Sequence, residues 1–85
     1  MLSKTVTLVA NTNTPIDLGE TLDGFTVYNL GSSDVYVNVD KVATIEGDGS
    51  AIVPANSFRS IAQRGGTINM ISSGTPKVEL LGYHR

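Results

Sequence analysis

The sequence holds few side chains that could carry out chemistry. It has no cysteine and one histidine, His84, beside the last residue. Without cysteine there is no disulfide, zinc–thiolate site, iron–sulfur cluster or thiol nucleophile. A serine–histidine–aspartate triad would need His84, but chain ends fray and a general base must be held within hydrogen-bond reach. We therefore expect His84 to be an exposed tail residue rather than a catalytic one.

Acidic residues that lie close in sequence offer a second kind of chemistry. Asp34 and Asp40 fall at a turn and at a strand end, where aspartate commonly bonds to backbone, so we interpret both as structural. Residues 46–50, Glu-Gly-Asp-Gly-Ser, are rich in oxygen, but two carboxylates do not supply the six to eight ligands of calcium. Asp48-Gly49 is instead typical of a hairpin turn. We predict no catalytic residue, no metal site, no cofactor and no enzymatic activity.

Charge and hydropathy limit the classes of partner. The formal net charge is −2, and the charged residues are scattered along the chain. A basic stripe for phosphate contacts is missing, so we expect no nucleic-acid binding. No stretch approaches the roughly 20 apolar residues that span a bilayer, so we expect no membrane association. Residues 1–5 lack the apolar run of a signal peptide, and we expect synthesis in the cytoplasm.

The elements that must position these residues are predicted to be strands. Val, Ile and Thr supply 24 of the 85 residues, and β-branched side chains favour pleated surfaces. The period-two pattern is clearest over 35–40, where valines alternate with polar residues and Tyr36. Residues 57–64 are the only plausible place for a helical turn, and the choice there stays open. The predicted strands are 5–10, 15–18 at a sheet edge, 25–30, 35–40, 51–53, 67–72 and 77–83.

Turn signals recur every 8 to 12 residues, which is typical of a sandwich or barrel. We predict one all-β domain over residues 1–85, a small antiparallel β-sandwich with seven to eight short strands. Within it, residues 25–40 and 67–83 are each interpreted as a hairpin.

Apolar residues on the outer faces of these strands suggest an interface. If Val35, Val37 and Val39 point inward, Tyr36 points outward, whereas we expect Tyr28 and Tyr83 to cap the core. One face per strand of a two-layer sandwich should be wet, so further apolar residues imply cover by another layer or subunit. Short strands that switch sheets would also bury both faces. The candidate interface residues are Tyr36, Val9, Leu30, Ile71 and Leu81.

Three segments carry a resemblance to a known class of protein. They are 27–37 (VYNLGSSDVYV), 52–58 (IVPANSF) and 66–78 (GTINMISSGTPKV). Together they resemble small tailed-bacteriophage virion proteins with a β-sandwich or jelly-roll fold. The resemblance covers residues 25–83, and its motifs form the fold rather than a site.

The resemblance implies a jelly-roll-like fold and a capsid decoration or cement protein that stabilises the head by bridging capsid subunits. It implies the virion as location after synthesis in the host cytoplasm. The implied partners are the major capsid protein or other virion proteins, and other copies of the chain in a homo-oligomer. The alternatives are a neck or tail component, or a receptor- or carbohydrate-binding module. A carbohydrate site would need an aromatic platform.

Overall fold

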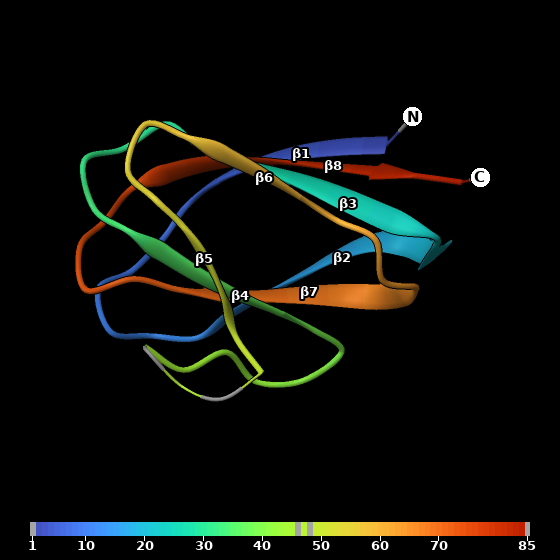
Figure 1. Ribbon diagram of the computed structural model, residues 1–85, viewed down its shortest axis with the longest axis horizontal. Coiled ribbons are helices and arrows are strands. Elements are labelled where there is room, and N and C mark those ends of the chain that lie inside the picture. The colour runs from blue at the N-terminus through green and yellow to red at the C-terminus, as the bar shows by residue number, and fades with distance from the viewer. Residues whose placement is uncertain (1, 46, 48, 85) are drawn as a thin grey trace.

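The chain folds into two packed antiparallel sheets. A computed structural model describes residues 2–45, 47 and 49–84, and these form eight strands without a helix. Sheet A has the strand order β1-β8-β3-β6, and sheet B has the order β2-β7-β4-β5. They form the upper and lower layers of Figure 1. The strands are β1 (Leu2–Thr7), β2 (Thr14–Leu22), β3 (Gly24–Asn29), β4 (Val35–Val39), β5 (Ala51–Val53), β6 (Phe58–Ile61), β7 (Gly65–Ile71) and β8 (Lys77–Tyr83).

The strand order is that of a jelly roll. Four antiparallel pairs, β1–β8, β2–β7, β3–β6 and β4–β5, make one long ribbon that rolls up on itself. Two further pairs, β3–β8 and β4–β7, join neighbouring turns of the ribbon into sheets. The prediction of a small, jelly-roll-like antiparallel β-sandwich with seven to eight strands is confirmed.

Both predicted hairpins are wrong. The connection after β3 crosses from sheet A to sheet B, and the connection after β7 crosses back. Alternation and turn residues identify a strand, but they do not identify its partner. The hairpin that the structure does form joins β4 to β5. The predicted turn at 47–49 falls in its connection, but residues 46 and 48 lie outside the described part of the chain.

The other strand predictions differ mainly at their ends. The first strand covers Leu2–Thr7 rather than 5–10, and the segment that allowed a helical turn is strand β6. Pro15 lies on β2, an edge strand of sheet B as predicted. β2 runs on to Leu22 through an irregular pairing in which Gly19 has a φ of 90°. Glycine takes this left-handed conformation without steric strain.

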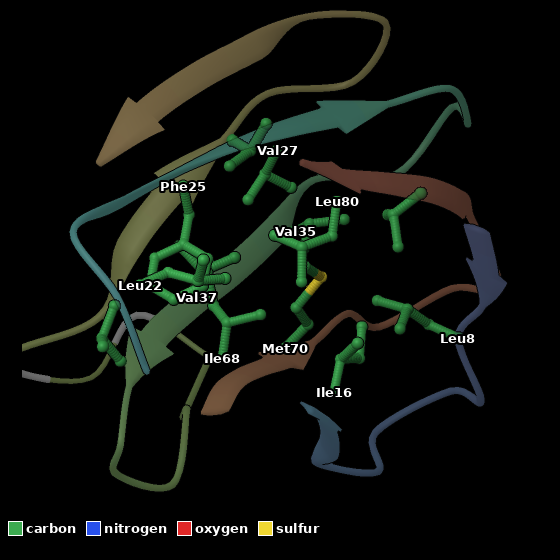
Figure 2. Packing of buried hydrophobic residues seen from close by; sticks show 13 residues of the cluster. Leu8, Ile16, Leu22, Phe25, Val27, Val35, Val37, Ile68, Met70 and Leu80 are labelled. Carbon is green, nitrogen blue, oxygen red and sulfur yellow. The ribbon is translucent and has the colours of Figure 1, made fainter. Parts of the chain in front are cut away.

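The core lies between the inner faces of the two sheets. Figure 2 shows the side chains of both sheets meeting there, with Phe25, Val27 and Leu80 facing Ile68 and Met70. All five are fully buried. The valines of β4 point inward as predicted, so the neighbouring side chains of the same strand point outward. The core therefore fixes which side chains reach the two outer faces.

Candidate functional site

The five predicted interface residues occupy three separate places. Tyr36 and Ile71 lie on the outer face of sheet B, because their neighbours Val37 and Met70 are buried. Leu30 and Leu81 lie on the outer face of sheet A by the same alternation. Val9 belongs to neither face. The candidate residues thus form two surfaces on opposite sides of the sandwich and one isolated position.

Val9 lies in the connection between β1 and β2. Its carbonyl oxygen accepts a hydrogen bond from the Thr12 backbone N–H at 3.2 Å, and Asn11 between them has a φ of 56°. Asparagine tolerates this conformation better than most residues. Val9 is the first residue of this turn, and it is 60% exposed.

On sheet B, a short apolar row crosses the outer face. Tyr36 on β4 pairs with Ile52 on β5 and with Ile71 on β7. Residues directly opposite each other in antiparallel strands have side chains about 5 Å apart on the same face. Tyr36 and Ile71 are half-buried, and Ile52 is exposed. Ile52 is part of this surface although the sequence did not single it out.

The chain itself covers another part of that face. Asn13 accepts a hydrogen bond from the Ala43 backbone N–H at 2.8 Å and donates one from Nδ2 to Asn69 Oδ1 at 3.0 Å. The segment 41–45 is therefore tied against the outside of sheet B, where Ala43 is buried. Figure 1 shows the connection after β4 running below that sheet. Part of the cover inferred from the sequence thus comes from the protein's own loop.

A groove of about 490 Å³ lies beside the apolar row. Among the described residues, Tyr36 and Ile52 line it together with Ser50 and Arg59, and so do Gly47, Gly49 and Ala51. Arg59 reaches across from β6, and its Nη1 donates to the Ile52 carbonyl oxygen at 3.2 Å. The guanidinium has five N–H donors, and one bond leaves others for a ligand. The groove thus combines an aromatic ring, a cation and a hydroxyl.

The outer face of sheet A carries a larger exposed apolar surface. Phe58 on β6 pairs with Tyr28 on β3, and their ring centroids lie 5.4 Å apart at an interplanar angle of 31°. Phe58 is 63% exposed, and Leu30 is 55% exposed. Leu81 lies half-buried on β8 and pairs with Thr26 on β3. We call Tyr28, Leu30 and Phe58 the sheet A cluster.

The tyrosines that were expected to cap the core instead lie outside it. Tyr28 packs against Phe58 on the outer face of sheet A. The ring of Tyr83 covers Gly24 on the same face, where a Cβ on that glycine would collide with it. The inward positions next to both tyrosines are occupied by Val27 and Gly82, so alternation directs the rings outward. Phe58 was not among the predicted interface residues, because residues 57–64 show no clear hydrophobic periodicity that would assign it to a face.

A separate group of polar side chains includes His84. His84 is partly exposed as expected, but its Nε2 bonds to Glu20 Oε1 and its Nδ1 lies 3.7 Å from Asp23. Asp23 also accepts from Arg64 Nη1 at 2.7 Å. These side chains link β2 to the connections after β2 and β6 and to the residue after β8. In the described residues, no set of three histidine, aspartate or glutamate side chains could hold a metal ion.

Asp34 and Asp40, which we predicted to be structural, both accept hydrogen bonds from backbone N–H groups. Asp34 Oδ1 accepts from the Ala55 N–H at 3.0 Å. Asp40 Oδ1 accepts from Gly66 and Thr67 at 3.0 and 2.9 Å. Asp34 thus joins the connection after β3 to the connection after β5, and Asp40 joins the connection after β4 to β7. The oxygen-rich segment 46–50 falls partly outside the described residues.

No family model, curated protein or solved structure matches the chain at a significant level. Nor does any described segment form a helix long and apolar enough to cross a membrane. The two outer surfaces of the sandwich are therefore the features that bear on its function.

Proposed function

We propose that this protein is a non-catalytic structural component of a bacteriophage particle. In this role it decorates or cements the capsid by bridging neighbouring subunits, and it resides in the virion after synthesis in the host cytoplasm. Its partner is the major capsid protein or another virion protein.

One observation carries the proposal: exposed apolar side chains occupy both outer faces of the sandwich. Phe58 and Leu30 lie on sheet A, and Ile52 lies on sheet B beside Tyr36. Contiguous exposed apolar side chains in a small protein mark surfaces that bind other molecules. A protein that bridges two subunits needs two such surfaces facing different ways. The apolar side chains on the two outer faces of this sandwich are consistent with that need.

The fold and the sequence resemblance give further support by analogy. Jelly rolls occur in viral capsid and lectin domains, although a fold alone does not establish a function. Repetition over a shell adds multivalent strength to contacts that are individually modest. A small chain with modest surfaces suits this mode of binding.

The first test is the number of copies of this chain in purified particles from its source, relative to the major capsid protein, by quantitative mass spectrometry. Near-stoichiometric copies are expected for a cement or decoration protein. A dozen or so copies would indicate a neck or tail component, and none would contradict the virion proposal.

Variants on the two faces test the mode of attachment. Tyr36→Ala on sheet B and Leu81→Asp on sheet A should each reduce incorporation into particles by about tenfold or more, because interface anchors dominate binding energy. Both side chains lie outside the core, so the midpoint of thermal unfolding should fall by only a few degrees. If both variants simply unfold, these positions belong to the fold rather than to an interface.

A carbohydrate-binding role is the second candidate, and the groove beside Tyr36 favours it. An aromatic ring next to the Arg59 guanidinium and the Ser50 hydroxyl offers both stacking and hydrogen bonds to a sugar. A glycan array with Arg59→Ala as control should show binding by the native chain alone. A blank array would remove this candidate.

A further inference from the structure

The sheet A cluster leaves a large apolar area in water. Phe58 and Leu30 are more than half exposed, and the Tyr28 ring fills the space beside Phe58. Removing such apolar side chains from water is favourable. Small domains without disulfides or metals commonly gain burial by oligomerising. Covering the cluster would therefore stabilise the protein.

The charges on this face are few and of opposite sign. Lys77 and Glu79 both point outward from β8, because Val78 between them is fully buried. Neither has an ion-pair partner among the described residues. The other outward positions of the four strands carry uncharged side chains in the described part of the chain. Such a face repels neither cations nor anions as a whole.

Register places these charges beside the cluster in two neighbouring rows. Glu79 pairs with Tyr28, which pairs with Phe58, so these three form one row across β8, β3 and β6. The Leu30 backbone N–H donates to the Lys77 carbonyl oxygen at 2.9 Å, which continues the ladder and forms the next row. One row is thus acidic and aromatic, and the next is basic and aliphatic.

These two rows are complementary to each other under a two-fold rotation. An axis that crosses the strands of sheet A level with Val78 and Asn29 lays one row of each copy over the other row of its partner. Glu79 then meets Lys77 of the second copy, and Tyr28 meets Leu30. In an isologous interface each such contact occurs twice. Charge and hydrophobicity therefore match at the same time.

We propose that the outer face of sheet A is a homodimer interface, with a second copy packed face to face about this axis. A stable interface takes about 800 Å² from each partner, less than a fifth of the chain's accessible surface of 4529 Å². The dimer would direct its two sheet B faces away from each other, so in a virion the pair, rather than the single chain, would supply the two surfaces that bridge neighbouring subunits. Dimer formation does not depend on the proposed virion role.

The test uses charge reversal in purified full-length protein, followed by sedimentation equilibrium at low ionic strength. The native chain should be a dimer at micromolar concentration. Lys77→Glu and Glu79→Lys each place like charges opposite each other twice, so each should raise the dissociation constant by about tenfold or more. Lys41→Glu makes the same charge change on an exposed residue of the loop after β4. It should leave the dimer unchanged.

Mixing the two charge variants tests whether Lys77 of one copy faces Glu79 of the other. A Lys77→Glu chain paired with a Glu79→Lys chain brings opposite charges together at both contacts, so an equimolar mixture should form a heterodimer with near-native affinity. A monomeric native chain, charge variants that dimerise like the native one, or a mixture that stays monomeric would each overturn the proposal. Copy number in particles is measured separately, so the virion role can fail while the dimer stands, or the reverse.

Discussion

The buried side-chain amide of Asn29 bonds to the connection that crosses between the two sheets. Asn29 occupies an inward position of β3, where its neighbours in the alternation are core residues. Its Nδ2 donates to the carbonyl oxygens of Ser33 and Val53 at 2.7 and 3.1 Å, and its Oδ1 accepts from Gly31 at 3.0 Å. The side chain thus satisfies the backbone of the connection that leads from sheet A to sheet B.

We expect Asn29→Ala to destabilise the protein strongly. It removes the partner of two part-buried backbone groups of that connection and of the buried Val53 carbonyl oxygen on β5, at roughly 1–3 kcal/mol for each buried group. The free energy of unfolding in urea should fall by about 3 kcal/mol. Asn38→Ala is the control, because the Asn38 side chain makes one long bond to Val42 at 3.4 Å near the surface. A loss no greater than that of the control would contradict this role.

For single residues, the sequence predicts whether a side chain points inward or outward better than it predicts the bonds that the side chain makes. The outward positions of Tyr36 and Leu30 follow from period two, and the structure agrees. Val9 was expected on the outer face of a strand over 5–10, but it lies in the connection after β1. Asn29 could not be assigned, because a polar residue in an inward position is distinguishable from a surface residue only when its partners are known. Those partners include Val53, which is 24 residues away in the chain.

Among the elements, the strands are largely predictable and their pairing is not. The extent of β8 agrees with the prediction for 77–83, because local alternation is sufficient for it. The predicted hairpins fail because the connections after β3 and β7 are arches between layers. Ser72 shows how the second is held: its Oγ donates to the Asp34 carbonyl oxygen at 2.7 Å and accepts from the Gly74 N–H at 3.2 Å. These bonds depend on tertiary contacts that the local sequence does not reveal.

The loop on sheet B offers a prediction about local opening. Asn13→Ala removes the hydrogen bond from the Ala43 N–H and the one to Asn69, which together link the loop to β7. Hydrogen exchange of the Ala43 amide should become at least about tenfold faster, since two bonds contribute on the order of 2 kcal/mol. Thr12→Ala, which removes an exposed bond within the preceding turn, should leave that amide unchanged. Equal rates in the two variants would mean that packing alone holds the loop.

For the whole molecule, the rolled ribbon determines which contacts can form early. Only β4 and β5 are joined as a hairpin in the described chain, whereas β1 and β8 lie at opposite ends of the sequence. Closing a longer loop costs more conformational entropy, so pairing between distant strands is slow. Folding should therefore start at the β4–β5 end of the ribbon and close last at β1–β8, where both termini lie in Figure 1.

A circular permutant tests this order of events. Leu2 pairs with Gly82, so a short glycine–serine linker can join the termini, and new ends can be opened between residues 46 and 48. The permutant should reach the same fold, but β1 and β8 are now the local hairpin. In pulse-labelling hydrogen exchange, the amides of β8 should be protected before those of β4, the reverse of the native order. If β4 is protected first in both chains, side-chain packing rather than loop closure sets the order, and the ribbon description would hold for the final structure alone.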